Sequence, residues 1–596
     1  MRQRLLYLTK VYLTTVLIFI VAKWVFMFAN RSGHDFAAAD ALSVVRHGLS
    51  LDLSTSLYLL ILPFLVVLIS IFLERPWLKR ILRIYYAIVA VALMLAFVAD
   101  TSLYPFWGFK LDASCLQYLA SPDEARASVS GLYLAVRIAV FIVGAAVLWW
   151  IFCHIPLWKK KPSNPLVASL VSLLLIPVFI IGIRGGLDES TTNIGQVYYS
   201  QNQFLNHSAV NPVFSFLSSF EKTASEIVEY DFMDDAACQT LLSGVFPTES
   251  VLTDTLLRTN RPNVVIILLE SCSNVFAPVM PQLNRLKSEG IWFSNCFGNT
   301  YRTDRGTVST LSGYPAFPTM SVMKMPKKAA QLPSIAKSLQ QEGYQTSYLY
   351  GGDINFTNMR SYLIATGWER LHWKADYTSE EQNSAKWGVR DDITFKTLYH
   401  QILAADPSKP FLMGFSTLSS HEPWDVPVKK LADEVQNAFH YLDQCIGQFV
   451  SDLKTTPQWD NLLIVLLPDH GINFRDIDET HPERNHIPML WLGGAVREPK
   501  VVGQFCNQTD FAATLLGQMN LRHDDFTFSR DVLSKNYQKP FGFHCFNNGF
   551  SVVDSTGFTV FDLTADKIIA GSNNNDAVRL GKAILQTSSE DLKEKK

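Results

Sequence analysis

Two acidic positions lie just after strongly apolar runs in the second half of this sequence. Glu270 follows residues 264–269, and Asp469 with its neighbour His470 lies just after residues 462–467. Such runs are typical of buried strands, and ligands gather at the carboxyl ends of strands in open α/β sheets. We therefore expect these side chains to converge on one site. Two carboxylates and an imidazole suit Mn²⁺, Zn²⁺ or Mg²⁺, whereas the competing interpretation is a helix or turn cap.

A hydroxyl-rich run lies between these positions in the chain. Residues 298–306 read Gly-Asn-Thr-Tyr-Arg-Thr-Asp-Arg-Gly and contain Thr303. A threonine hydroxyl is inert near neutral pH unless a base or a metal ion activates it. Thr303 is thus a candidate nucleophile if the metal site forms beside it, or else the cap of a helix that begins near Asp304. The rival hydroxyls are Thr307, Ser309 and Thr310.

The elements that would hold these residues begin with a membrane part. Five apolar stretches precede residue 186, and each can reach roughly the 20 helical residues that span a bilayer. They are residues 11–28, 53–73, 84–98 with its flanks, 132–155 and 165–183. Basic residues precede the first stretch and lie in the second and fourth junctions, which places these segments in the cytoplasm by the positive-inside rule. An odd number of spans then puts the rest of the chain outside.

Composition supports a membrane part followed by a globular part. Charged residues make up only 18% of the 596 positions, and the formal net charge is -2. This balance lacks the basic surface that nucleic-acid binding requires, so nucleic acid is excluded as a partner. The eight cysteines show no CxxC spacing, which argues against a zinc knuckle or a thioredoxin-type pair and leaves disulfide bonding open.

The second part reads as an α/β domain. Its strand candidates are residues 264–269, 346–350, 411–415, 462–467 and 489–492. These runs lack polar alternation and are separated by helix-length segments, which predicts a mainly parallel sheet covered on both faces. Small antiparallel strands are expected over residues 541–567. The expected domains are a transmembrane domain of about five helices (1–186), an extracytoplasmic linker (187–260), a catalytic domain (261–580) and a charged tail (581–596).

A series of short motifs in the second part is similar to the lipoteichoic acid synthase family of the alkaline phosphatase and sulfatase superfamily. In order, these motifs are Leu269-Glu-Ser271, Pro281-Gln-Leu-Asn-Arg-Leu286, Tyr301-Arg-Thr-Asp-Arg-Gly306, Tyr350-Gly-Gly-Asp353, Trp387-Gly-Val-Arg-Asp391, Ser419-Ser-His421, Pro468-Asp-His-Gly471, His486-Ile-Pro488 and Gln508-Thr-Asp510. The Arg-Thr-Asp-Arg-Gly form resembles relatives from Gram-negative bacteria more than the Gram-positive polymerases. The Cys-x-Pro-x-Arg or Ser-x-Pro-x-Arg core of formylglycine sulfatases does not occur, which disfavours sulfate-ester hydrolysis.

The resemblance implies roles for particular residues. It makes Thr303 the nucleophile and, together with Glu270, Asp469 and His470, a ligand of a divalent metal, with Mn²⁺ favoured and Zn²⁺ or Mg²⁺ open. It places His421 beside the substrate, where an imidazole suits proton transfer.

More residues of the pocket follow from the same resemblance. Asp353 and Arg360 keep the spacing of a family pair that holds glycerol phosphate. The residues between them depart from the family pattern, because the tryptophan usual in Gram-positive enzymes is absent. His486 matches a position that binds a second metal in other superfamily members, so it is a candidate ligand for metal or substrate.

The function implied is transfer of a phosphoglycerol group from a membrane phospholipid to a glycan or lipid acceptor through a phosphothreonine. The enzyme is expected to be integral to the bacterial inner membrane, with a periplasmic catalytic domain. Three alternatives stay open at this point. They are a phosphoethanolamine transferase, a phosphodiester hydrolase, and a catalytically silent envelope sensor or scaffold.

Overall fold

A computed structural model describes residues 1–595 except Gly33, Glu74, Asn548 and the ranges 108–109, 112–114, 116–130, 221–226 and 247–253. The chain forms two compact units, Met1–Lys222 and Thr223–Lys596. The boundary falls inside the expected linker 187–260. Residues 187–220 pack with the first unit, while the described residues from 227 onward pack with the second. Part of the expected linker lies outside the described residues.

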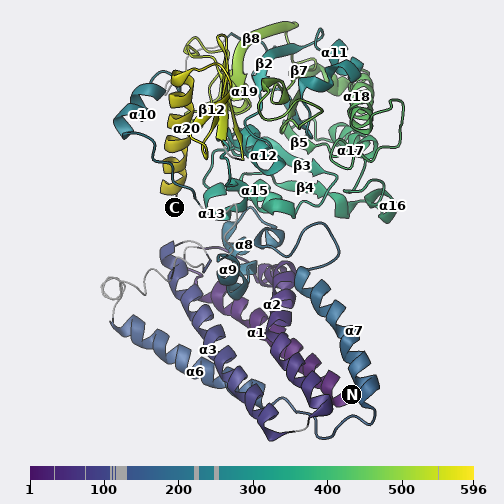
Figure 1. The fold of residues 1–596 in the computed structure, drawn as a ribbon, viewed down its shortest axis with the longest axis vertical. Coiled ribbons are helices and arrows are strands. Elements are labelled where there is room, and N and C mark those ends of the chain that lie inside the picture. The colour runs from purple at the N-terminus through teal and green to yellow at the C-terminus, as the bar shows by residue number, and fades with distance from the viewer. Residues whose placement is uncertain are drawn as a thin grey trace. The chain divides into compact units, whose positions relative to one another are not determined.

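The first unit is helical (Figure 1). Its long helices are α1 (Arg2–Ala29), α2 (Ala38–Phe72), α3 (Pro76–Trp107), α6 (Gly131–Cys153) and α7 (Pro165–Arg184). All five are long and apolar enough to span a membrane, which confirms the expected multi-pass organisation. The short helices α8 (Gln203–Ala209) and α9 (Pro212–Ser218) follow, and the side chains of Asn202 and Asn211 cap their N-termini.

Charged side chains inside the first unit occur in pairs. Lys23 of α1 forms an ion pair with Asp52 of α2, and Lys110 forms one with Asp100 of α3; all four side chains are buried. The Asn211 side chain donates a further hydrogen bond of 2.9 Å to Asp52. Each buried carboxylate therefore faces an ammonium group, as apolar surroundings require.

The second unit is built on an eight-stranded sheet in the order β4-β3-β5-β1-β6-β7-β2-β8. Its strands are β1 (Asn263–Leu269), β2 (Ile291–Phe297), β3 (Gln345–Tyr350), β4 (Arg370–Trp373), β5 (Phe411–Ser416), β6 (Leu462–Pro468), β7 (Met489–Leu492) and β8 (Lys500–Asn507). Only β7 runs antiparallel to its neighbours. The prediction of a mainly parallel sheet is confirmed, and the five expected strands correspond to β1, β3, β5, β6 and β7.

Helices cover both faces of this sheet, which explains the unbroken apolar runs. Alternate side chains of β1 enter two different hydrophobic clusters. Leu268 packs with one cluster, which takes in α12 (Thr303–Ser312), α14 (Ile335–Gln341), α15 (Met359–Ala365) and α19 (Asp510–Gln518). Leu269 packs with the other, which takes in α11 (Pro281–Leu286), α17 (Asp391–Leu403) and α18 (Glu434–Leu453). A strand buried on both faces needs apolar residues at every position.

A smaller antiparallel sheet completes the second unit, as expected. It contains β9 (Gly542–Phe546), β10 (Gly549–Asp554), β11 (Gly557–Asp562) and β12 (Lys567–Gly571). Helix α20 (Asn575–Glu594) packs beside it in Figure 1. Residues 581–596, expected to be a charged tail, therefore belong largely to a helix. The charges of this segment lie on one side, whereas Ile584, Leu585 and Leu592 are buried on the other.

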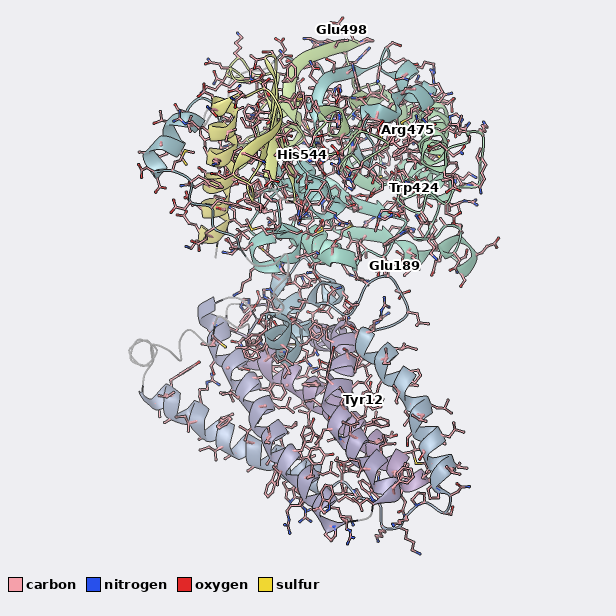
Figure 2. The ribbon with its side chains drawn as sticks, viewed as in Figure 1. Tyr12, Glu189, Trp424, Arg475, Glu498 and His544 are labelled. Atoms are coloured by element: carbon pink, nitrogen blue, oxygen red, sulfur yellow. The ribbon has the colours of Figure 1, made fainter. Side chains whose placement is uncertain are left out.

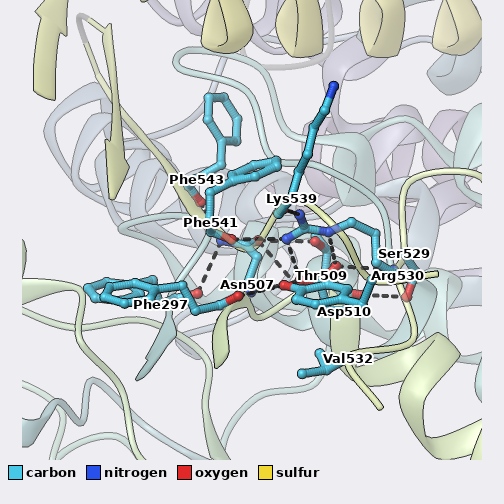
Figure 3. A network of polar contacts seen from close by, with 12 residues as sticks. Phe297, Asn507, Thr509, Asp510, Ser529, Arg530, Val532, Lys539, Phe541 and Phe543 are labelled. Atoms are coloured by element: carbon cyan, nitrogen blue, oxygen red, sulfur yellow. Dashed lines mark hydrogen bonds and ion pairs between the residues drawn. The ribbon is translucent and has the colours of Figure 1, made fainter. Parts of the chain in front are cut away.

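A buried ion pair connects α19 to the chain that leads into the small sheet. The Arg530 guanidinium donates to both oxygens of Asp510, over 2.8 and 2.6 Å, and to the backbone oxygens of Lys539 and Phe541 (Figure 3). Such a fully bonded pair fixes the position of the chain around residue 510. Figure 2 shows the side chains of both units, with His544 of β9 in the interior of the second.

Candidate active site and metal centre

The predicted acidic cluster forms at the carboxyl ends of two neighbouring strands. Strands β1 and β6 are parallel and pair through Leu269 and Pro468, so the residues that follow them lie side by side. Ligand atoms of Glu270, Asp469 and His470 all lie within 4.8 Å of one another, and all three residues are buried. The site therefore lies where open α/β sheets collect ligands.

Backbone contacts fix which nitrogen of His470 faces this cluster. Its Nδ1 lies 3.1 Å from the carbonyl oxygen of Gly471, which can only accept a hydrogen bond, so Nδ1 carries the proton. The lone pair is then on Nε2, which lies 3.6 Å from Glu270 Oε1 and 3.6 Å from Asp469 Oδ2. This is the tautomer that a metal-binding histidine needs.

Thr303 is the first residue of α12 and reaches the same cluster. Its Oγ1 lies 3.3 Å from Glu270 Oε2 and 3.3 Å from His470 Nε2. Gly306 makes this approach feasible, because a Cβ at that position would come within 2.0 Å of the Asp469 carbonyl oxygen. The positive end of the α12 dipole, at its N-terminus, also favours a negative group on the Thr303 side chain.

The four residues fit a divalent cation. Asp469 Oδ2 is buried and has no hydrogen-bond partner among the described residues, whereas Oδ1 accepts from the backbone N–H groups of Ser271 and His470. Burial raises the pKa of Glu270 to about 8, and the adjacent Asp469 carboxylate adds to this rise. Two carboxylates thus share this site with a single imidazole. A cation would satisfy the unpaired oxygen and balance the charge.

Two residues that hold this site were not singled out from the sequence. Ser271 donates from Oγ to Glu270 Oε1 over 2.6 Å, and its φ of 59° places it in the left-handed region. Gln508 donates from its amide to the carbonyl oxygens of Pro468 and Asp469. Its other side-chain atom accepts from the backbone N–H of Asn299, so Gln508 connects the end of β6 to the segment before Thr303. Both residues occur in the matching motifs, which was the available signal.

His421 lies in a loop that is bonded directly to the metal cluster. The Thr417 hydroxyl accepts from the Glu270 backbone N–H, and the Ser420 hydroxyl donates to the Glu270 carbonyl oxygen. Asp391 holds the middle of this loop by accepting from the backbone N–H groups of residues 418 and 419. These bonds fix the direction in which the loop leaves β5.

The ring of His421 is held in one orientation. Its Nδ1 donates to the Glu422 carbonyl oxygen over 2.8 Å, which leaves Nε2 as the nitrogen that can accept a proton. The ring packs against Trp387 with a centroid separation of 4.5 Å. Phe356 also contacts Trp387, in an edge-to-face arrangement with a centroid separation of 5.9 Å. Trp387 and Phe356 are therefore aromatic surfaces close to His421 in a chain that lacks the tryptophan usual in Gram-positive relatives.

Asp353 and Arg360 lie beyond the carboxyl end of β3. Asp353 is buried and accepts from the backbone and side chain of Asn355. Burial lowers the pKa of Arg360, and the carboxylates of Asp376 and Asp353 oppose that effect. The carboxylates of Glu270, Asp353 and Asp469 add to the effect of burial in raising the pKa of Tyr350. Tyr350 thus lies near both the metal cluster and Asp353.

His486 and Arg305 make contacts outside the metal cluster. His486 Nε2 donates to the Ser294 carbonyl oxygen over 2.8 Å, and the ring stacks on Phe297. Among the described residues, His486 is not part of the three-residue ligand cluster. Arg305 donates to the carbonyl oxygens of residues 319 and 320, so its guanidinium positions that loop. A metal or substrate role for His486 stays a prediction.

The second unit is similar to known proteins. Residues 262–521 match the family model described as Sulfatase. Lipoteichoic acid synthase 2 of Bacillus subtilis is 27% identical over 315 residues, which cover 46% of this chain and 48% of that protein. Phosphoglycerol transferase I of Xanthomonas axonopodis pv. citri is 24% identical over 311 residues, which cover 46% of this chain and 43% of that protein. The chain thus spans about half the length of the curated relatives it matches.

A solved structure shares the fold. The crystal structure of a protein in the alkaline phosphatase superfamily from Vibrio parahaemolyticus superposes with a TM-score of 0.52 at 22% identity. The match covers 61% of this chain and 97% of that one. The second unit therefore contains a sulfatase-like domain, and over about half of its length the chain is similar to lipoteichoic acid synthases and phosphoglycerol transferases I.

Proposed function

We propose that this chain is a multi-pass membrane transferase that moves a phosphoglycerol group from a phospholipid to a hydroxyl of a glycan or lipid through Thr303. The observation that carries the proposal is the position of Thr303 Oγ1, 3.3 Å from both Glu270 and His470. Relatives named as lipoteichoic acid synthase and phosphoglycerol transferase support phosphoglycerol as the transferred group.

In the first half of the reaction, Thr303 Oγ attacks the phosphorus of the donor phosphodiester. A bond forms between Oγ and phosphorus, the bond from phosphorus to the diacylglycerol oxygen breaks, and a phosphothreonine diester remains. Glu270 Oε2 is an acceptor within reach of the Thr303 proton. Nε2 of His421, when protonated, delivers a proton to the departing diacylglycerol oxygen. The N-terminus of α12 stabilises the phosphate on Thr303.

In the second half, the acceptor hydroxyl attacks the same phosphorus. The bond from phosphorus to Thr303 Oγ breaks, and the proton that Glu270 accepted in the first half returns to Oγ and regenerates the Thr303 hydroxyl. Nε2 of His421 takes the proton of the acceptor, because Nδ1 is already engaged with the Glu422 carbonyl oxygen. Water in place of the acceptor would make the same chain a hydrolase.

Glu270, Thr303, Asp469 and His470 are the residues that would hold a divalent metal, with Mn²⁺ favoured over Zn²⁺ and Mg²⁺. When bound, such an ion lowers the pKa of a coordinated hydroxyl and neutralises charge on a phosphoryl oxygen. Asp353, Arg360 and His421 are proposed to contact the transferred group, where the half-buried guanidinium of Arg360 suits phosphate oxygens. The basic segments of the membrane unit support a periplasmic catalytic unit in an inner membrane.

The test uses full-length protein in nanodiscs that contain phosphatidylglycerol, with Mn²⁺ present. We expect Thr303→Ala to abolish diacylglycerol release, with a loss of at least about 10³-fold, as follows the removal of a covalent nucleophile. Thr303→Ser keeps a hydroxyl on the same atom and should retain measurable turnover. Thr307→Ala is the matched control, because that hydroxyl is buried and has no hydrogen-bond partner. Unchanged release by Thr303→Ala would contradict the proposal.

A second arm separates transfer from hydrolysis and identifies the group that is moved. Free headgroup and headgroup attached to a glycan or lipid acceptor are quantified with phosphatidylglycerol and with phosphatidylethanolamine as donors. The proposal expects phosphoglycerol on the acceptor. Headgroup release that no acceptor alters would favour hydrolysis, and preference for the ethanolamine lipid would replace phosphoglycerol by phosphoethanolamine.

A further inference from the structure

A groove of about 540 Å³ lies in the first unit between α1, α3 and α6, and residues 210 and 212 also line it. Its walls are mostly apolar and include Leu17, Val21, Met94, Phe97 and Val147. Leu17 and Val21 are 61% and 53% exposed, so the groove opens on the lipid-facing side of α1. Its shape and lining suit an acyl chain.

One end of this groove carries charge, in contrast to its walls. Lys23, Asp100, Lys110 and Arg137 all line it, and Asp52 pairs with Lys23 behind them. The two lysines are each paired with a carboxylate. Arg137 forms no ion pair among the described residues, and its guanidinium donates to the Tyr133 hydroxyl over 3.4 Å. Among the residues that the structure describes, the charges at this end of the groove therefore sum to one positive charge in excess.

The charged end lies near the ends of the spanning helices. Lys23 lies six residues before the end of α1, and Arg137 lies six residues after the start of α6. At a rise of about 1.5 Å per residue, both Cα atoms lie about 9 Å inside the helix ends. Arginine and lysine side chains at this depth extend toward the headgroup region. The apolar walls then run toward the middle of the membrane.

We propose that this groove binds one anionic phospholipid, with the phosphodiester at Arg137 and an acyl chain along the wall formed by α1, α3 and α6. Charge complementarity carries this assignment, because an unpaired cation in an apolar groove recruits an anion, and basic pockets between spanning helices bind anionic headgroups. The remaining exposed faces of α6 and α7 are apolar, so they give no preference for an anionic lipid. Lipid binding in the groove does not depend on the proposed function. Only the idea that this lipid belongs to the class that the second unit uses as its donor rests on that function.

The experiment measures lipid retention by the full chain. Protein released from nanodiscs of equal parts phosphatidylglycerol and phosphatidylethanolamine is examined by native mass spectrometry. Wild-type protein is expected to retain phosphatidylglycerol preferentially. Arg137→Gln should lower that retention about fivefold, which corresponds to about 1 kcal/mol for one basic residue near an anionic membrane surface. Equal retention of both lipids by wild type, or unchanged retention by Arg137→Gln, would overturn the proposal.

Two variants control for charge and for folding. Arg46→Gln removes an exposed arginine near the start of α2 that does not line the groove, so it should leave lipid retention unchanged. Arg137→Lys keeps the charge and should recover most of the phosphatidylglycerol retained by wild type. A loss as large in Arg46→Gln would show that the effect is not specific to position 137. No recovery in Arg137→Lys would show that the positive charge at position 137 does not hold the headgroup, which would overturn the proposal.

The catalytic variant separates this inference from the proposed function. Thr303→Ala should retain phosphatidylglycerol as wild type does while losing turnover. Turnover by Thr303→Ala together with reduced lipid retention by Arg137→Gln would refute the proposed function and leave the groove standing. Loss of turnover in Thr303→Ala together with unchanged lipid retention by Arg137→Gln would refute the groove as a lipid site and leave Thr303 as the proposed nucleophile.

Discussion

The second unit buries two carboxylates beside one imidazole, whereas the first unit buries each carboxylate against a lysine. Glu270 and Asp469 share a site in which one carboxylate oxygen has no hydrogen-bond partner. Asp52 and Asp100 are paired with ammonium groups. A buried ion pair is balanced in charge within the chain, even though Asp52 Oδ2, like Asp469 Oδ2, has no hydrogen-bond partner among the described residues. Like charges gathered in one place instead need a ligand of opposite charge.

The same reasoning applies with the sign reversed at the groove of the first unit. There the lysines are satisfied, and Arg137 supplies the excess charge. The metal cluster has an excess of negative charge that fits a cation, and the groove has an excess of positive charge that fits an anion. A charge without a counter-charge is therefore the feature by which the two proposed ligand sites differ from the structural ion pairs.

Removing one partner of a buried ion pair tests the comparison in the first unit. We expect this change to have the largest effect on stability. Lys23→Met leaves Asp52 buried without its cation, so it should lower the free energy of unfolding of the first unit by about 3–5 kcal/mol. Denaturant unfolding in micelles measures it. The double variant Lys23→Met, Asp52→Leu removes both charges and should recover most of the loss. A double variant as unstable as the single one would mean that packing, not charge, accounts for the effect.

Removing one charge from the metal cluster tests the other side. Asp469→Asn keeps the size of the side chain but removes the unpaired anionic oxygen. Metal affinity, measured by calorimetry, should fall by more than about 100-fold, since loss of an outer partner alone costs about 10–100-fold. The second unit should stay folded, because relief of like-charge repulsion offsets the lost hydrogen bonds. Asp460→Asn, at an exposed position, is the control. Unchanged metal affinity in Asp469→Asn would show that Asp469 is not a metal ligand.

Ser271 tests how far the cluster depends on its supporting bonds. Its hydroxyl orients Glu270, so Ser271→Ala should lower metal affinity by about 10–100-fold with little change in stability. The neighbouring Ser273→Ala is a matched control, because the Ser273 hydroxyl is buried without a hydrogen-bond partner. Equal affinities for the two variants would show that Ser271 does not position the ligand.

Asp531 is a buried carboxylate outside the cluster of metal ligands that the described residues form. Its substitution should have the smallest effect of the changes considered. Burial raises the pKa of Asp531 to about 7, and Asp510 adds to the rise. The folded state then binds the proton more tightly than the unfolded state, whose pKa is about 3.9, so this group costs stability as pH rises from about 4 to about 7. Asp531→Asn should be more stable than wild type by about 1–2 kcal/mol at pH 7.5 and equal at pH 4.

Urea unfolding at the two pH values measures this difference. Added Mn²⁺ should leave the difference unchanged, since Asp531 lies outside the ligand cluster that the described residues form. A gain in stability that is the same at both pH values would contradict the assignment of the effect to the Asp531 carboxylate.

Much of the architecture followed from the sequence because its main signals are local. Apolar runs predicted the spanning helices and the doubly buried strands, and strand ends brought Glu270 to Asp469. The strands β2 and β8 were not predicted, because polar residues such as Ser294 and Gln504 interrupt their runs. Helix α20 was mistaken in part for a tail because its exposed face carries the charges of the chain end.

The supporting residues of the site escaped prediction for a different reason. The contact from Ser271 to Asp469 spans 198 positions, and that from Gln508 to Asn299 spans 209. Neither residue type nor spacing indicates such a bond before the fold brings the two ends together. The left-handed backbone of Ser271 is likewise unexpected at a residue with a side chain.

The central claim is that Thr303 carries the transferred group, and peptide mass spectrometry tests it most directly. The full chain is mixed with phosphatidylglycerol and Mn²⁺ in the absence of an acceptor, quenched in acid within seconds, and digested. The account predicts a phosphoglycerol adduct on the peptide that contains Thr303, located at that residue by fragmentation and absent from Thr303→Ala. An adduct on another residue, or turnover without any adduct on Thr303, would contradict it.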